Sequence, residues 1–227
     1  MKSLIIIPCF NEEKSIERLV YKLFDELPNF DILVVDDCST DNSYGIAKKI
    51  TKTISLSENL GIGGAVQTGI IYAELNQYDL CIQIDGDGQH LPSEVKKLVT
   101  EYKKSGASLI IGSRFISQVG FQSSFARRMG INLISFFQSI LFGLNIKDST
   151  SGMRLMDRSA ISFFAKNYPL DFPEPISAVE LHLNGNQISE IPVMMQEREF
   201  GESSIYFLKS IFYMIKVITF IILLKIP

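Results

Sequence analysis

The sequence predicts an α/β fold in which helices flank a mainly parallel β-sheet. Short apolar runs alternate with amphipathic helical segments through the first half of the chain, a pattern typical of parallel strands that are buried on both faces. Polar residues and glycines gather directly after these runs. The 227 residues, of which 46% are hydrophobic and 21% charged, are enough for one domain with a sizeable core.

The first half carries the apolar runs that predict strands and the spacings that predict helices. Strands are expected at Ser3–Cys9, Asp31–Asp36, Thr53–Ser57, Leu80–Ile84 and Ser108–Gly112. Helices are expected from Ile16 to Leu27, after a cap at Thr40 or Asp41, within the glycine-rich stretch Asn59–Gly69, and from Pro92 to about Lys104.

The second half is more apolar and less regular. Met129–Leu144 is apolar nearly all round, and its few polar residues form one narrow stripe at helical spacing. This pattern predicts a helix embedded either in the core or in a membrane surface. Gln187–Val193 predicts a further strand.

The C-terminal run Ile205–Leu224 is about 30 Å long as a helix, which is marginal for crossing a bilayer. Lys209 and Lys216 lie on one face of that helix and argue against a simple span. We expect it to lie in a membrane interface with its lysines reaching the head groups. The alternative is an ordinary packed terminal helix. The expected division is a domain at 1–204 and a membrane-interface helix, or the start of an anchor, at 205–227.

Charge, cysteine usage and the N-terminus bear on partners and location. The net charge of −3 gives no general attraction for nucleic acid, so no such partner is expected. Cys9, Cys38 and Cys81 show neither disulfide-framework nor zinc spacing, which favours reduced thiols in a cytosolic setting. The apolar run Leu4–Ile7 is shorter than the apolar region of a signal peptide, so secretion by that route is not expected.

The stretch Cys81–Glu94 carries two carboxylates that point to a metal. Asp85 and Asp87 follow a short apolar strand and are separated only by Gly86. Carboxylates crowded at a strand end repel each other, and a divalent cation relieves that repulsion. Mg²⁺ and Mn²⁺ prefer such oxygen ligands, Gln89 adds a neutral oxygen, and the glycines let an anion approach the backbone. The alternative is a polar turn with solvated aspartates.

Further motifs surround this stretch. They are IPCFNEE (Ile7–Glu13), VVDDCSTDNS (Val34–Ser43), NLGIGGAVQTG (Asn59–Gly69), DGDGQH (Asp85–His90), GSR (Gly112–Arg114), DSTSGMR (Asp148–Arg154), EIPV (Glu190–Val193) and RxxGxSS (Arg198–Ser204). In this order the set resembles the family 2 glycosyltransferases, specifically the polyprenyl-phosphate glycosyltransferases related to dolichyl-phosphate mannose synthase. The resemblance implies a GT-A fold, a nucleotide-sugar donor and a bound Mg²⁺ or Mn²⁺.

The resemblance also implies a nucleotide site at the strand ends. Phe10 is placed to flank the base, Glu12 to accept hydrogen bonds from ribose hydroxyls, and Asp37 to bind the base edge, with Asp36 as the alternative. Glycines at Gly61, Gly63 and Gly64 would allow close approach of the backbone. The nucleotide-binding residues expected are Pro8, Phe10, Glu12, Asp37, Gly64 and Gly86.

Asp85, Asp87 and Gln89 match the family's metal and diphosphate site, whereas His90 is interpreted as structural support. Arginines are expected to hold the diphosphate or an anionic acceptor, because guanidinium binds phosphate well. The candidates are Arg114, Arg127 and Arg198, with Arg128 beside them. The chain departs from the mannose synthases at Glu202 and Ser204, where those enzymes place a lysine.

These features predict inverting transfer of a sugar from a nucleotide diphosphate to a polyprenyl phosphate at the cytoplasmic face of a membrane. A phosphate monoester is already anionic at neutral pH and needs little help from a base. One alternative is transfer to a carbohydrate hydroxyl, with Glu174 as the base. Another is a nucleotide-sugar binding protein without catalysis. A homo-oligomer is compatible with all three.

Overall fold

The computed structural model describes residues 1–117, 125–197 and 207–225, apart from the side chains of 125–127 and 207–212. The strands are β1 (Ser3–Cys9), β2 (Asp31–Asp36), β3 (Lys52–Ser55), β4 (Leu80–Gln83), β5 (Leu109–Ser113), β6 (Arg154–Asp157) and β7 (Ile188–Pro192). The helices are α1 (Ile16–Glu26), α2 (Ser43–Ile50), α3 (Gly61–Leu75), α4 (Pro92–Ser105), α5 (Phe125–Phe142), α6 (Arg158–Asn167), α7 (Pro173–Leu183) and α8 (Phe207–Leu223).

The strands form one sheet in the order β3-β2-β1-β4-β6-β5-β7. All neighbours pair in parallel except at β6, which is antiparallel to both β4 and β5. The prediction of a mainly parallel sheet in an α/β fold is therefore confirmed. β6 was not predicted, because it is only four residues long and begins with a buried arginine, Arg154.

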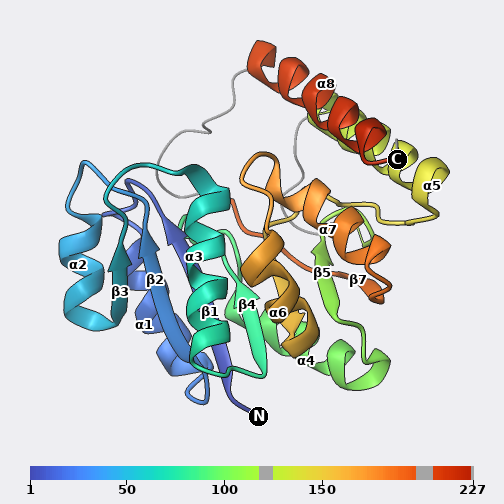
Figure 1. The fold of residues 1–227 in the computed structure, drawn as a ribbon. Coiled ribbons are helices and arrows are strands. Elements are labelled where there is room, and N and C mark those ends of the chain that lie inside the picture. The colour runs from blue at the N-terminus through green and yellow to red at the C-terminus, as the bar shows by residue number, and fades with distance from the viewer. Residues whose placement is uncertain (118–124, 198–206, 226–227) are drawn as a thin grey trace.

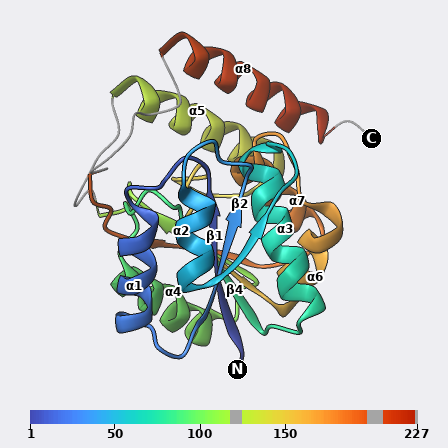
Figure 2. The same ribbon diagram turned by 90° about the vertical axis from the view of Figure 1, so that its left-hand side faces the viewer.

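Helices cover both faces of the sheet (Figures 1 and 2). Alternate residues of β1 enter the two cores, with Leu4 and Ile6 facing α3 and α6. Ile5 and Ile7 face α1 and α4. Because both faces are buried, the strand is apolar without interruption, which is why its limits could be predicted from the sequence.

Several predicted strand limits shift by one or two residues in the structure, and one predicted helix cap differs. The third strand lies at Lys52–Ser55 rather than Thr53–Ser57, where it pairs with β2 through Asp36 and Ser55. Helix α2 has Asn42 at its N-cap position, not Thr40 or Asp41. The Asp41 carboxylate nevertheless accepts a hydrogen bond from the backbone N–H of Ser43 in the first turn of that helix.

Helices α5 and α8 lie side by side above the sheet, as both ribbon views show (Figures 1 and 2). A side chain at Gly130 would place its Cβ 1.5 Å from the sulfur of Met214, so glycine permits this close approach. On α8, Val217 and Ile221 are buried against Ile134 of α5 and Ile176 of α7. One face of the C-terminal helix is thus packed on the protein, and no described helix is long and apolar enough to cross a membrane.

Candidate functional site

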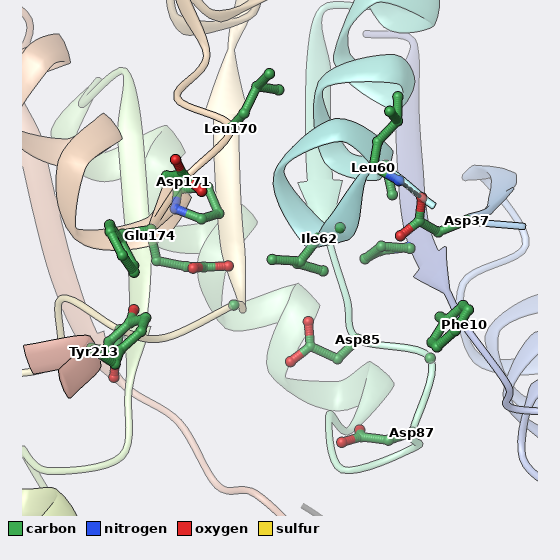
Figure 3. Close-up of a pocket in the computed structure, with 18 of the residues that line it drawn as sticks. Phe10, Asp37, Leu60, Ile62, Asp85, Asp87, Leu170, Asp171, Glu174 and Tyr213 are labelled. Atoms are coloured by element: carbon green, nitrogen blue, oxygen red, sulfur yellow. Dashed lines mark hydrogen bonds between the residues drawn. The ribbon is translucent and has the colours of Figure 1, made fainter. Parts of the chain in front are cut away.

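A pocket of about 720 Å³ opens at the carboxyl ends of β1 and β4. Within the sheet, β2 pairs with one edge of β1 and β4 pairs with the other edge, so the strand order reverses at β1. Ligands of open α/β sheets bind at such a reversal of strand order. Figure 3 shows the pocket between the strand-end loops and the segment Leu170–Glu174, with Tyr213 of α8 at one side.

One end of the pocket carries the residues expected to bind the nucleotide. Pro8, Phe10, Glu12 and Asp37 all line it, and Phe10 is 46% exposed. The Asp37 carboxylate accepts a hydrogen bond of 2.7 Å from the backbone N–H of Leu60. Burial raises the pKa of Asp37, and the hydrogen bonds from Leu60 and Gly61 oppose that rise. An exposed aromatic ring beside a hydrogen-bonded carboxylate is suited to a nucleobase.

The neighbouring aspartate has a different environment. Asp36 is 1% exposed, and its carboxylate accepts a hydrogen bond of 3.0 Å from the Ser55 hydroxyl, which joins β2 to β3. Asp36 is absent from the lining of the pocket, whereas Asp37 is present. The geometry therefore favours Asp37 over Asp36 as the nucleotide contact.

Asp85 and Asp87 follow β4 in a tight loop that Gly88 turns with a φ of +77°. Both aspartates line the pocket, together with Gly86. Burial raises the pKa of Asp85, and the charge of Asp87 adds to the rise, while His90 and Arg114 oppose it. Two carboxylates that are crowded and partly desolvated favour a cation between them and the substrate.

His90 supports this loop from behind. It is 2% exposed, and its Nδ1 accepts a hydrogen bond of 3.0 Å from the backbone N–H of Asp85. Its Nε2 lies 3.8 Å from the Asp85 carboxylate. This geometry agrees with the structural role interpreted from the sequence.

Gly152 lies directly against the Asp85 carboxylate. A Cβ at this position would lie 2.6 Å and 2.8 Å from the two carboxylate oxygens of Asp85, closer than real Cβ atoms approach. Only glycine leaves room for the carboxylate in its present position. Gly152 belongs to the DSTSGMR motif, which the sequence singled out without showing what it contacts.

Replacing Gly152 with Ala is expected to weaken Mn²⁺-dependent binding of a nucleoside diphosphate by about tenfold or more, because the added methyl group displaces Asp85. The measurement is a thermal-shift titration with Mn²⁺ and the nucleotide. Ser149→Ala is the matched control, because the buried Ser149 hydroxyl has no hydrogen-bond partner within the described ranges. Equal binding by Gly152→Ala and wild type would contradict the role of Gly152.

The donor set fits Mg²⁺ or Mn²⁺ that is shared with a substrate. No group of three or more His, Cys, Asp or Glu side chains able to hold a metal occurs among the residues that the structure describes. A pair of carboxylates in an open pocket suits an ion that completes its shell with water and phosphate oxygens. Gln89, the third predicted ligand, is not among the residues that line the pocket, and its side-chain amide donates a hydrogen bond to the Gln196 carbonyl at 3.0 Å.

Arg114 was expected to reach the diphosphate or the acceptor, but the structure places its guanidinium on Asp148. The Nε and Nη2 atoms each lie 2.7 Å from a carboxylate oxygen, and both residues are buried. Burial acts to lower the pKa of Arg114, but the hydrogen bonds and charge of Asp148 outweigh it and raise the pKa. Nη2 also donates to the hydroxyl of Thr150, which lines the pocket. Arg114 therefore adjoins the pocket through Thr150.

The EIPV motif supports this ion pair. The Glu190 carboxylate accepts hydrogen bonds from the backbone N–H groups of Lys147 and Asp148, the latter at 2.7 Å. It thereby holds the backbone that presents the Asp148 carboxylate to Arg114. The EIPV motif is visible in the sequence, but its contact with the loop at Lys147 and Asp148 is not, because these two segments meet only in the folded protein.

Of the remaining predicted residues, Gly64 does not line the pocket and the others lie outside the part of the chain that the structure describes. Gly64 is buried within α3, where a Cβ would lie 2.4 Å from that of Leu60. Gly64 does not line the pocket itself, and its role is to leave room for the side chain of Leu60. Arg198, Glu202 and Ser204 lie outside the described residues, as does the side chain of Arg127.

The other end of the pocket combines a carboxylate with apolar side chains. Glu174, in the first turn of α7, and Asp85 project into the pocket from opposite sides (Figure 3). Burial raises the pKa of Glu174, and the nearby charge of Arg154 opposes the rise. Behind Glu174 the wall is apolar and includes residues that the sequence did not mark as site residues, among them Ile131, Ile134, Phe172, Tyr213 and Met214.

The fold and sequence match known proteins. The model of the family described as Glycosyl transferase family 2 matches residues 4–164. The chain is 31% identical to the UDP-N-acetylglucosamine–dolichyl-phosphate N-acetylglucosaminyltransferase of Methanococcus voltae, with 83% of each chain covered. It is also 31% identical to the undecaprenyl-phosphate mannosyltransferase of Micrococcus luteus, covering 89% of this chain and 87% of that protein.

Solved structures share the fold at lower identity. Glucosyl-3-phosphoglycerate synthase from Mycobacterium tuberculosis, in complex with Mn²⁺, UDP and glucosyl-3-phosphoglycerate, matches with a TM-score of 0.68 at 16% identity. That match covers 99% of this chain and 79% of the synthase. A mannosyltransferase from Pyrobaculum calidifontis in complex with GDP-Man and Mn²⁺ gives 0.64 at 14% identity, covering 89% of this chain and 58% of that one. The architecture is that of these glycosyltransferases, and structures of this fold bind Mn²⁺ or Mg²⁺ together with nucleotides.

Proposed function

The chain belongs to glycosyl transferase family 2, and we propose that it moves a sugar from a nucleotide diphosphate to a polyprenyl phosphate with inversion at the anomeric carbon. The observation that carries the proposal is one pocket with two chemically different ends. In Figure 3, Phe10 and Asp37 lie on one side of Asp85 and Tyr213 lies on the other, where Tyr213 packs with the apolar lining residues Ile134, Phe172 and Met214. The relatives from Methanococcus voltae and Micrococcus luteus, named for transfer to dolichyl and undecaprenyl phosphate, support a lipid phosphate as acceptor.

Asp85 and Asp87 are the residues that would hold Mg²⁺ or Mn²⁺. A bound ion would neutralise the negative charge that develops on the departing nucleotide diphosphate. Pro8, Phe10, Glu12 and Asp37 would orient the nucleoside, so that the diphosphate extends toward the two aspartates.

The acceptor phosphate attacks the anomeric carbon in line with the departing diphosphate. No proton has to be removed from an anionic phosphate oxygen, so the step does not require a general base. The apolar wall would receive the first part of the isoprenoid. That wall is held in place by Phe172, whose ring stacks edge-on against Tyr213 of α8 with centroids 4.9 Å apart.

Glu174→Gln distinguishes this proposal from transfer to a carbohydrate hydroxyl. With a phosphate acceptor, kcat at saturating donor is expected to fall by less than about tenfold, because no base is lost. A hydroxyl acceptor would need Glu174 as base, and turnover would then fall by several orders of magnitude. The measurement is steady-state kinetics with each class of acceptor, and a loss of about a thousandfold or more would favour the rival.

The function itself is tested by incubating the protein with Mn²⁺, a labelled nucleotide sugar and polyprenyl phosphate. A thermal-shift screen of nucleoside diphosphates with Mn²⁺ first selects the donor, because a tight ligand raises the melting temperature by mass action. Label that enters the lipid phase only when polyprenyl phosphate is present supports the proposal. Binding of the donor with neither transfer nor donor hydrolysis would favour a nucleotide-sugar binding protein without catalysis.

We propose that α5 and α8 also attach the protein to the cytoplasmic face of a membrane, with 1–204 as the catalytic domain and 205–227 as an interface helix. Both helices expose apolar side chains away from the pocket. On α5 these are Met129, Leu133, Phe136 and Ile140, which recur at helical spacing, and on α8 they are Ile215, Phe220, Ile222 and Leu223. Lys216 on α8 and Lys225, two residues after its end, are exposed and suit anionic head groups, whereas the side chain of Lys209 lies outside the described residues.

The outward and inward faces of this helix pair should have separable roles. The double variant Leu133→Asn, Phe136→Asn is expected to weaken sedimentation with anionic liposomes by about tenfold, because it removes two exposed apolar side chains. Its transfer to a short-chain acceptor in detergent should stay unchanged. Met214→Ala, which changes the pocket wall, should instead raise the KM for that acceptor several-fold. Unchanged liposome binding in the double variant would show that this surface is not the membrane contact.

A further inference from the structure

Arg154, the first residue of β6, is a buried arginine whose role neither the fold nor the proposed chemistry has used. It is 2% exposed and contacts the segment Ser149–Ser151, in which Thr150 lines the pocket. Its guanidinium donates to the carbonyls of Ser151 and Ser149, each at 2.8 Å, and to the hydroxyl of Ser177 at 3.0 Å. All three acceptors are neutral. Within the described ranges no carboxylate lies within ion-pair distance of it.

Such a residue is costly to keep in a core. A buried cation without a directly paired anion loses its hydration and regains only part of it through neutral hydrogen bonds. An apolar residue of similar size would pack at this strand position without that cost. The neighbouring strand residues Leu155 and Met156 are apolar and buried, so the sheet itself does not call for a charge here.

The three hydrogen bonds join two walls of the pocket. Ser149 and Ser151 belong to the loop that continues into Gly152, whose backbone lies against the Asp85 carboxylate. Ser177 belongs to the first turns of α7, and its hydroxyl also donates to the carbonyl of Glu174 at 3.2 Å. Arg154 thus links the backbone behind Asp85 to the helix turn that presents Glu174.

The space between these two carboxylates is where a donor sugar would sit. Phe10 and Asp37 lie on one side of Asp85 in Figure 3, and Glu174 lies on the other. A nucleotide that starts at Phe10 and places its diphosphate at Asp85 and Asp87 carries its sugar onward toward Glu174. Carboxylates commonly accept hydrogen bonds from hydroxyl groups, and the charge of Arg154 favours the ionised form of Glu174.

We propose that Arg154 is a positioning residue that sets the spacing and charge of the part of the pocket between Asp85 and Glu174, and thereby the affinity for the sugar of the donor. The inference rests on the proposed use of a nucleotide sugar, but it does not depend on which acceptor receives the sugar. The loop behind Asp85 is also held through Asp148, which pairs with Arg114 and donates its backbone N–H to Glu190. Loss of Arg154 is therefore expected to shift the α7 side, with Glu174, and to affect the sugar more than the nucleoside diphosphate. A purely structural arginine would affect both ligands alike.

The test compares the affinities of each variant for a nucleotide sugar and for the corresponding nucleoside diphosphate, both with Mn²⁺, by calorimetry. Arg154→Met is expected to bind the nucleotide sugar about tenfold more weakly than wild type and the diphosphate within about twofold of wild type. Arg154→Lys keeps the charge but cannot span three acceptors, so its affinity for the nucleotide sugar should lie between those of wild type and Arg154→Met. Arg158→Met is the matched control, because Arg158 forms an ion pair with Glu74 on the surface and lies outside the pocket lining.

Ser177→Ala keeps the test decisive if Arg154→Met does not fold. It removes only the bond from Arg154 to α7 and should weaken nucleotide-sugar binding about threefold without weakening diphosphate binding. Equal losses for both ligands, or no loss for either, would overturn the inference. A wild-type protein that binds the nucleotide sugar but transfers nothing to polyprenyl phosphate would overturn the proposed acceptor instead, and would leave the role of Arg154 standing if the selective loss is seen.

Discussion

Replacing Asp87 with Asn is expected to lower kcat/KM for sugar transfer by about a thousandfold or more while leaving the fold unchanged. The substitution removes the negative charge that would hold Mg²⁺ or Mn²⁺ but keeps the size of the side chain. Its amide oxygen can still accept the hydrogen bond that Asp87 receives from the backbone N–H of Gln89 at 3.0 Å. The variant should therefore melt near the wild-type temperature. The measurements are initial rates over a range of Mn²⁺ concentrations and a thermal melt.

Asp79→Asn provides the matched control for this variant. Asp79 directly precedes β4, whereas Asp87 follows it, and its side chain is 54% exposed outside the pocket lining. The control should retain wild-type transfer at every Mn²⁺ concentration. A fully active Asp87→Asn protein would show that the carboxylate is not needed and would remove the basis for the metal site.

The second large effect concerns stability. Asp148→Ala is expected to lower the free energy of unfolding by about 3–5 kcal/mol, because it removes a bidentate partner from the buried Arg114. For a chain of this size the melting temperature should fall by roughly 10 °C. The measurement is urea-induced unfolding followed by circular dichroism, together with a thermal melt.

A surface ion pair supplies the comparison. Glu74→Ala breaks the ion pair between Glu74 and Arg158, whose side chain is 45% exposed. This change should lower the free energy of unfolding by less than about 1 kcal/mol. The double variant Asp148→Ala, Arg114→Met should regain part of the loss, because no charge is then left buried. Equal losses at Asp148 and Glu74 would contradict the view that the pair between Arg114 and Asp148 holds this side of the pocket.

Much of the fold could be predicted because central strands such as β1 and β2 are mostly apolar. The limits of Ser3–Cys9 and Asp31–Asp36 agree with the prediction, since both strands lie between paired neighbours under helices on both faces. The antiparallel strand β6 could not be predicted in this way. Its four residues have little pattern of their own, and they are extended because β4 and β5 pair with them on either side.

Part of the candidate site could also be predicted from the sequence, and part could not. Phe10, Asp37 and Asp85 could be grouped from the sequence, because the carboxyl ends of parallel strands meet at one edge of a sheet. The contacts that hold the site depend on packing between distant segments. Gly152 against Asp85 and Asp148 on Arg114 follow from how the loop before β6 folds over the sheet, which no local pattern reveals.

The wall formed by α5 and α8 is a third case. The sequence showed that Met129–Leu144 is apolar nearly all round and that Ile205–Leu224 is apolar with Lys209 and Lys216 on one face, but not which face each helix buries. In the structure Ile134 and Met214 line the pocket, whereas Leu133 and Ile215 are exposed. Residues that are adjacent in the sequence thus lie on opposite faces of the same helix. The packing of α8 on α5 and α7 decides which face is buried.

The central claim is that Asp85 and Asp87 together hold one divalent ion at the mouth of β4. Titration of the protein with Mn²⁺ in the presence of a nucleoside diphosphate, followed by the electron paramagnetic resonance signal of free Mn²⁺, tests it directly. Wild-type protein is expected to take up one Mn²⁺ per chain, and the double variant Asp85→Asn, Asp87→Asn, folded by its thermal melt, to take up none. Equal uptake by the two proteins would contradict the claim.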